Sequence, residues 1–215
     1  MTAPVPNSVV PVQLYDVARD AAVDAERWST IGEKNLADWE AEWIPALHVQ
    51  LKVLHQSGVN RSLWPQSRKW DWRDKQAAIE LSLANQSFAI VAQGTTQAMM
   101  IVDLTKRARL QSQLLQHLVY VDFLEVAPWN RHDLQGGTPR FTGAGSILIG
   151  TAIEFSRVQG FKGRIGLHSL PQSNSFYANA CGMEDMGADP NYANLRYFEM
   201  TLDAAERFMK KGKEQ

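Results

Sequence analysis

The stretch Arg140-Phe141-Thr142-Gly143-Ala144-Gly145-Ser146 separates a run of β-forming residues that ends near Val126 from an amphipathic run that begins near Ala144. Glycines at such a junction let main-chain N–H groups converge on an anion, and the dipole of the following helix adds partial positive charge. The stretch, here called the glycine turn (residues 140–146), therefore predicts a phosphate site. It fits neither a dinucleotide turn nor a hydrolase elbow, which need a glycine in place of Leu148, and it lacks the Gly-Lys-Ser/Thr of a P-loop.

Short apolar runs on both sides of the glycine turn predict the rest of the architecture. Upstream, segments rich in Val, Ile, Phe and Tyr predict consecutive antiparallel strands at 88–92, 98–104 and 118–126. Downstream, hydrophobic spacing and helix-ending glycines predict, in order, a helix at 144–159, a strand at 164–170, a helix at 173–181, a strand at 197–202 and a tail helix at 203–211. This order favours a mixed α/β sandwich over a doubly wound sheet.

The first third of the chain is predicted to be rich in helices. Pro11 allows the segment 9–17 at most a short edge strand, and the pattern turns helical from Asp20 onward. Pro45 predicts the first residue of a second helix, and a third helix is expected over 71–84. One buried helix face is indicated by residues that recur every three or four positions: Leu36, Trp39, Trp43 and Leu47.

The glycine turn resembles the Arg/Gln-x-x-Gly-x-Gly/Ala signature of the GCN5-related N-acetyltransferases, with Arg140, Gly143 and Gly145 at the matching positions. Residues 123–128, Phe-Leu-Glu-Val-Ala-Pro, resemble the family's strand beside the pantetheine arm, and residues 175–183 resemble its Phe/Leu-Tyr-x-x-x-Gly-Phe helix end. Order and spacing agree over residues 88–202. The resemblance implies a single acetyltransferase-like domain with a central, mostly antiparallel sheet flanked by helices. Its parts are a helix-rich acceptor-side segment (1–86), an acetyl-CoA-binding core (87–202) and a tail helix (203–215).

The sequence departs from the family pattern at two places. Residues 132–139 intervene before Arg140, so Arg131 competes with Arg140 for the first position of the signature. We favour Arg140, because only Arg140 has both glycines at the right offsets. Leu170 stands where the family often has Asn, and Asn174 lies nearby but out of that register.

The resemblance implies that acetyl-CoA is the cosubstrate and that no metal is needed. The acetyl group would pass directly to an amine of a small molecule or peptide, and main-chain amides near Val126, where the family splays two strands, would polarise the thioester carbonyl. The residues implied to contact acetyl-CoA are Val126, Ala127, Arg140, Phe141, Thr142, Gly143, Ala144, Gly145 and Ser146.

Acetyl transfer to an amine needs a base for the ammonium and an acid for the departing thiolate. Tyr177 resembles the family's acid, and a phenol has about the acidity that this step requires; a half-buried core residue is the alternative reading. For the base, period-two alternation puts Tyr120 and Asp122 on one face of the predicted strand and Glu125 on the other. Asp122 is our first choice and Glu125 our second, each with the alternative of a solvated or paired strand carboxylate. A CoA-binding regulatory or interaction module without catalysis is the alternative function.

Several other side chains could bind a ligand or a metal ion, but their patterns predict a site less strongly. Three tryptophans either line an acceptor pocket or, as we favour, pack helices on the sheet: Trp64, Trp70 and Trp72. The histidines lack the spacing of a metal site. His48 and His55 could share a helix face but have no third ligand, and the others are scattered: His117, His132 and His168. Cys181 is expected to be a packed apolar residue. A solvated end is expected for Lys210, Lys211 and Lys213.

Composition bounds the partners. The 215 residues carry 22 Lys and Arg against 23 Asp and Glu, for a net charge of −1, so no positive field favours nucleic acid or anionic lipid. The apolar runs are far shorter than the roughly 20 residues of a membrane span. The N-terminus lacks a basic region followed by an apolar core, and a single cysteine permits no internal disulfide, so a cytoplasmic location is expected. The expected partner is an amine acceptor, and a homodimer is left open.

Overall fold

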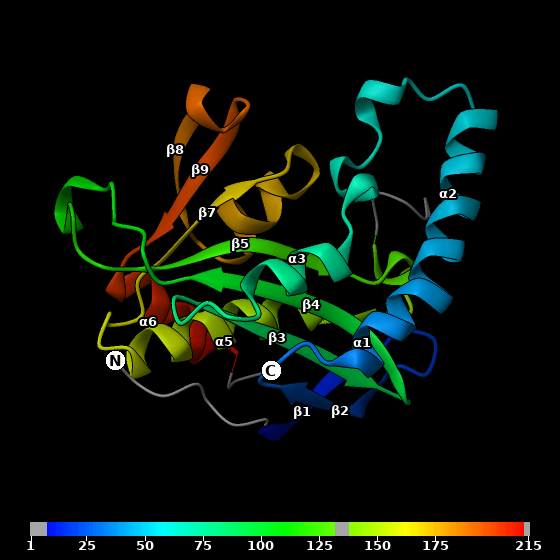
Figure 1. Ribbon diagram of the computed structural model, residues 1–215, viewed down its shortest axis with the longest axis horizontal. Helices are drawn as coiled ribbons and strands as arrows, with labels where there is room; N and C mark the ends of the chain where they lie inside the picture. Colours follow the sequence, from blue (N-terminus) through cyan, green and yellow to red (C-terminus); the bar gives the residue numbers. More distant parts are fainter. Residues whose placement is uncertain (1–7, 132–137, 213–215) are drawn as a thin grey trace. The chain divides into compact units, whose positions relative to one another are not determined.

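The computed structural model describes residues 8–131 and 138–212. They form a mixed α/β fold with mostly antiparallel strand pairs, as predicted (Figure 1). The chain divides into two compact units. The first unit comprises Met1–Met100 and Leu124–Gly145, and the second comprises Ile101–Phe123 and Ser146–Gln215. Strands β4 (Thr95–Asp103) and β5 (Val119–Val126) each run from one unit into the other.

In the first unit the strands follow the order β6, β1, β2, β3, β4, and the pairs β6–β1, β1–β2 and β2–β3 are antiparallel. Their bounds are β1 (Val9–Asp16), β2 (Ala21–Trp28), β3 (Asn85–Ala92) and β6 (Phe141–Thr142). Strands β3 and β4 are buried almost throughout, which explains why their sequences read as continuous apolar runs. The predicted strands at 88–92, 98–104 and 118–126 are confirmed.

The hairpin of β1 and β2 corrects two predictions for the N-terminal segment. Strand β1 is eight residues long, and residues from Ala21 form strand β2 instead of a helix. Pro11 is tolerated because β1 pairs with β6 only at Tyr15 and Asp16, so among the described residues the strand has a neighbour on one side alone at Pro11. The alanine-rich sequence of β2 favours a helix locally, but pairing with β1 and β3 outweighs that preference.

Helical structure in this unit begins at Glu33, not at Asp20. Helix α1 (Glu33–Asp38) continues through a π-helical turn, η1 (Trp39–Trp43), into helix α2 (Ile44–Gln56). The prediction that Pro45 opens a second helix is confirmed to within one residue, because Pro45 lies in the first turn of α2. Helix α2 is continuous with α1, however, through the wide turn in which the N–H of Ile44 donates to the carbonyl of Trp39. The remaining helical segments are η2 (Arg61–Leu63), η3 (Gln66–Lys69), α3 (Trp72–Ile79), which ends before the predicted 84, and η5 (Pro128–Asn130).

In the second unit the strands follow the order β5, β7 (Ile165–Ser169), β9 (Leu195–Met200), β8 (Glu184–Asp189). Strands β5 and β7 are parallel, whereas β7–β9 and β8–β9 are antiparallel. Helix α5 (Ala144–Val158) connects the parallel pair, and helix α6 (Leu202–Lys211) packs on it, with Met209 and Phe208 beside Gly150. Short helical turns complete the unit: η4 (Gln111–Gln113), η6 (Pro171–Ser173), η7 (Phe176–Ala180) and η8 (Pro190–Tyr192).

These elements confirm the predicted helix at 144–159, the strands at 164–170 and 197–202, and the tail helix. Strand β8 was not predicted, because its sequence is acidic, contains Gly187 at a positive φ of 88° and pairs with β9 through an irregular register between Asp185 and Ala188. Within residues 8–131 and 138–212, no helix combines the length and apolar character needed to cross a bilayer.

Candidate functional site

The base of the insertion at 132–139 is closed by two hydrogen bonds. The N–H of Arg140 donates to the carbonyl of Trp129 at 3.0 Å, and the N–H of Phe141 donates to Oδ1 of Asn130 at 2.9 Å. Arg140 thus follows η5 in space much as a residue directly after it would in sequence. The side chain of Arg140 is exposed, lies over the ring of Phe141 and donates to Oε1 of Gln93 at 2.7 Å.

The glycine turn leads directly into α5. Gly143 has a φ of 98°, a left-handed conformation that residues with a side chain rarely adopt, and the 15-residue helix begins at the next residue. The first N–H groups of a helix have no partner within it. Because the amide of Phe141 is already used by Asn130 and its side chain is buried, an anion here would meet the amides from Gly143 to Ser146.

The parallel pair β5–β7 separates at a defined point. Its register covers Val119 to Val121 on β5 and ends where Val121 pairs with Leu167. Strand β7 continues to Ser169, where it still pairs with β9. In sheets with parallel strands, ligands bind beyond the carboxyl ends of the strands, where the helix that follows presents its N-terminus. A site is therefore expected where β5 continues past its last pairing with β7.

The segment that contains Tyr177 follows β7. Tyr177 is buried on the π-helical turn η7, and its ring packs near Phe176 and Phe198 at centroid distances of 5.2 and 6.0 Å. Burial raises the pKa of Tyr177 well above its usual 10, so the side chain is a neutral phenol at physiological pH. Close by in sequence, Oδ1 of Asn174 is buried and has no hydrogen-bond partner among the described residues.

Glu125 belongs to a buried charged cluster in the first unit. Its carboxylate accepts hydrogen bonds from Nε1 of Trp72 at 2.8 Å and from Arg131 at 3.3 Å, and Arg131 also donates to Oγ of Ser67 at 3.0 Å. Burial raises the pKa of Glu125, and the positive charge of Arg131 opposes this rise. Arg131 therefore has a local ionic role, which leaves Arg140 as the arginine beside the glycine turn.

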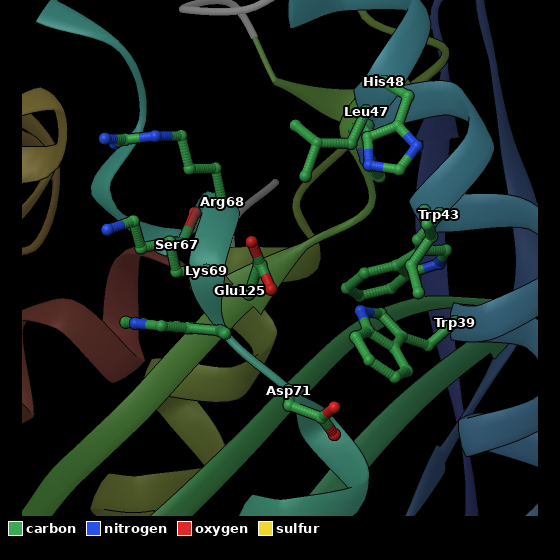
Figure 2. A pocket seen from close by; sticks show the side chains of 12 residues that line it. Trp39, Trp43, Leu47, His48, Ser67, Arg68, Lys69, Asp71 and Glu125 are labelled. Carbon is green, nitrogen blue, oxygen red and sulfur yellow. The ribbon is translucent and has the colours of Figure 1, made fainter. Parts of the chain in front are cut away.

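A pocket of about 230 Å³ opens over Glu125 (Figure 2). Its wall on η1 and α2 consists of Trp39, Trp43, Leu47 and His48, and the opposite wall is the segment 67–71. Figure 2 shows the Glu125 carboxylate between these walls, whereas the charged ends of Arg68 and Lys69 point away from the tryptophans. The aromatic pocket, as we call it, thus combines a buried carboxylate with tryptophan rings, a combination that suits an ammonium group.

The structure places the other residues that were singled out in the sequence in the aromatic pocket, in the core or on separate elements. Trp70 lines the aromatic pocket, Trp72 is fully buried on Glu125, and Trp64 packs edge-on against His55. Cys181 is buried, and burial raises its pKa to about 12, as expected of a packed residue. His117 stacks on Phe161, and Asp122 is half-buried on β5. Two predicted positions lie outside the described residues: His132 and Lys213.

One cluster in the second unit was missed because its members lie far apart in the sequence. The hydroxyl of Tyr120 is 2.6 Å from Nδ1 of His168, and Nε2 of His168 is 3.0 Å from Oδ2 of Asp189. Arg109 donates to the same carboxylate. No periodicity or motif connects these residues; the strand order β5, β7, β9, β8 places His168 on β7 and Asp189 on β8 two strands away. In the described parts of the chain, no group of three or more His, Cys, Asp and Glu residues is arranged to hold a metal ion.

The chain is similar to several solved structures. These include Mycobacterium smegmatis RimJ in complex with CoA-disulfide, at 14% identity with 96% of each chain covered and a TM-score of 0.49. Another is the PaiA N-acetyltransferase of Thermoplasma acidophilum with coenzyme A, at 13% identity over 82% of this chain and 98% of that one, with a TM-score of 0.49. A third is FeeM, an N-acyl amino acid synthase from uncultured soil microbes, at 10% identity over 83% and 92% of the two chains, with a TM-score of 0.47. No protein-family model and no curated protein matches the sequence.

Proposed function

We propose that the protein is an acetyl-CoA-dependent N-acetyltransferase that transfers the acetyl group directly to an amine. The observation that carries this proposal is the parallel pair β5–β7, which separates beyond Val121 and Leu167 and is connected by a helix with a glycine turn at its start. Parting strands leave room for an extended thioester arm beside main-chain groups, and the helix start offers amides to a pyrophosphate.

Three features of the chain each support binding of one part of coenzyme A. The amides from Gly143 to Ser146 would hold the pyrophosphate, with Arg140 able to neutralise a phosphate from the exposed side of the turn. The end of β5 at Val126 and Ala127 would run beside the pantetheine arm. The buried, unpaired Oδ1 of Asn174 is an acceptor that an amide N–H of pantetheine would satisfy.

The aromatic pocket is our proposed acceptor site. An ammonium group would be attracted by the faces of Trp39 and Trp43 and by the carboxylate of Glu125. The pocket favours Glu125 as the base that converts the ammonium into the attacking amine, ahead of Asp122, our first choice from the sequence. A raised pKa makes a carboxylate a better proton acceptor near neutral pH.

Tyr177 is the proposed acid for the departing thiolate. The phenol is neutral because burial raises its pKa, so it has a proton to give at physiological pH. The amine attacks the thioester carbonyl, and the C–S bond breaks as the C–N bond forms. The thiolate takes the phenol proton, the amide nitrogen loses its surplus proton to solvent, and solvent reprotonates Tyr177.

The test combines binding with turnover. We expect calorimetry to detect CoA and acetyl-CoA binding, and we expect thiol release from acetyl-CoA to depend on an added primary amine that gains one acetyl group by mass spectrometry. The panel should contain aromatic amines, polyamines, amino acids and short peptides with a free α-amino group. Tight CoA binding without transfer to any amine would support the non-catalytic module instead, and absence of CoA binding would contradict both.

A further inference from the structure

One wall of the aromatic pocket is an apolar surface built on a single continuous helical segment. Trp39 and Trp43 are four positions apart on η1 and therefore share a face, which Leu47 continues onto α2. Nε1 of Trp43 donates to the carbonyl of Thr96 at 2.8 Å, so this ring is held in place. Trp70 adds a third indole from the opposite wall. A ligand in the pocket would thus meet aromatic surface on two sides.

The carboxylate of Glu125, over which the pocket opens, can accept a further hydrogen bond. A carboxylate offers about four lone pairs. Oε2 accepts from Nε1 of Trp72 at 2.8 Å, Oε1 accepts from Arg131 at 3.3 Å, and the hydroxyl of Ser67 also bonds to the carboxylate. Burial nevertheless raises the pKa of Glu125, although these three partners act to lower it. An additional positive charge beside the carboxylate would therefore be stabilised.

The opposite wall carries the other charged residues that line the pocket: Arg68, Lys69 and Asp71. Arg68 is turned toward Pro65, whose carbonyl accepts from its Nη1 at 2.9 Å, and the charged ends of Arg68 and Lys69 point away from the tryptophans (Figure 2). Two cations against one carboxylate leave this wall with a net positive charge. A ligand that placed a second ammonium group near this wall would be repelled.

The volume and the buried charge limit the ligand further. A pocket of about 230 Å³ is smaller than the roughly 300–1,000 Å³ of sites that enclose drug-sized molecules. One ring on a short carbon chain suits this space better than a long chain does. A carboxylate next to the amine would lie beside Glu125, where two negative charges repel more strongly than they would in water.

We propose that the aromatic pocket selects a small primary monoamine that has an aromatic skeleton and no carboxylate next to the amine. This inference rests on the proposed function and names the class of its acceptor. The ammonium group donates to Glu125, and the ring packs between the Trp39–Trp43 wall and Trp70. Polyamines bind poorly because they bring a second ammonium to the positive wall, and α-amino acids bind poorly because they bring a carboxylate to Glu125.

Matched ligands test this selection by calorimetry, with and without CoA. We expect 2-phenylethylamine to bind about 10- to 100-fold more tightly than butylamine, which lacks the ring. Phenylalanine adds only a carboxylate to 2-phenylethylamine and should bind at least about tenfold more weakly. 1,4-Diaminobutane adds only a second ammonium to butylamine and should bind no more tightly. The same order should appear in kcat/KM for acetyl transfer.

Matched variants locate the ligand in the pocket. Leu47→Lys places a cation on the apolar wall and should weaken 2-phenylethylamine binding at least about tenfold with CoA affinity unchanged. Its control, Val49→Lys, adds the same charge at an exposed position of α2 outside the pocket and should leave the affinity unchanged. Lys69→Glu should tighten 1,4-diaminobutane binding about two- to fivefold relative to butylamine, whereas Lys52→Glu, an exposed control on α2, should not.

The outcomes separate this inference from the proposed function. If the wild type acetylates amines but prefers 1,4-diaminobutane or phenylalanine to 2-phenylethylamine, the selection is wrong and the transferase remains. A folded Leu47→Lys variant that binds 2-phenylethylamine as tightly as the wild type would also overturn the selection. If the ligands bind in the expected order but none is acetylated, the selection by the pocket is supported and the proposed function fails. If no amine binds with or without CoA, the pocket is not an amine site.

Discussion

Arg140 and Trp129 are joined by a main-chain hydrogen bond of 3.0 Å across an insertion of the sequence. The neighbouring bond from Phe141 to Asn130 reinforces this closure. Together they bring the glycine turn to the end of η5.

The glycine turn should be sensitive to a side chain at Gly143. Gly143→Val or Gly145→Asp should weaken CoA binding at least about tenfold, the equivalent of one lost charge-assisted hydrogen bond. Calorimetry on the folded variants measures this loss. The control is Gly187→Val, because Gly187 has a similar positive φ of 88° and lies in β8, so strain of the same kind should leave CoA affinity unchanged. If both turn variants bind CoA with wild-type affinity, the glycine turn is not part of the binding site.

Tyr177→Phe tests the proposed acid. The substitution keeps the packing near Phe176 and Phe198 and removes only the hydroxyl. We expect kcat to fall roughly 10- to 1,000-fold while CoA affinity changes little. Steady-state kinetics with an accepted amine and calorimetry with CoA measure the two quantities separately. An unchanged kcat would make Tyr177 a packing residue.

The pH dependence of the rate distinguishes the two candidate bases. A protonated carboxyl cannot accept a proton, so the rate should rise with pH through the pKa of the base. Burial raises that pKa for Glu125, which places the rising limb above the range of a free carboxylate. Glu125→Gln should flatten this limb and Asp122→Asn should leave it. The reverse result would return the role to Asp122.

The ion pair of Glu125 and Arg131 should contribute to the free energy of unfolding. Glu125→Gln leaves a buried guanidinium without its carboxylate and should lower the free energy of unfolding by about 3–5 kcal/mol. Replacing both residues, as in Glu125→Gln with Arg131→Met, should recover much of that loss. Denaturant titration with a coupling cycle measures the difference, and purely additive losses would contradict a direct pairing.

Gly166 should tolerate no side chain. A Cβ at this position would lie 2.6 Å from the hydroxyl of Tyr197 and 3.1 Å from Cδ2 of Leu118. Gly166→Ala should therefore destabilise the second unit by about 1–3 kcal/mol, because neighbours in a packed core cannot all move aside. Gly94→Ala in the open β3–β4 turn gives a size-matched comparison, although its positive φ adds backbone strain. Thermal unfolding measures the stability of the two variants. A Gly166→Ala variant as stable as the wild type would show that the core accommodates the added methyl group.

Local patterns predicted most of the elements after residue 85, because buried strands and helix-ending glycines leave signals within a few residues. They failed at β2, where alanine-rich sequence favours a helix until β1 and β3 pair with it. They failed again at β8, an irregular acidic strand that forms only on β9. In both cases the strand forms because it pairs with other strands, and its own sequence does not indicate which strands these are.

The candidate site divides in the same way. The sequence alone determined the glycine turn, the strand before it and the helix after it, because these depend on backbone freedom at Gly143 and on local hydrophobic spacing. Tertiary structure alone decided that Glu125 pairs with Arg131 beneath an aromatic pocket, and that His168 connects Tyr120 to Asp189. The reason is physical: hydrogen bonds between side chains from different strands depend on register and packing, which no short stretch of sequence contains.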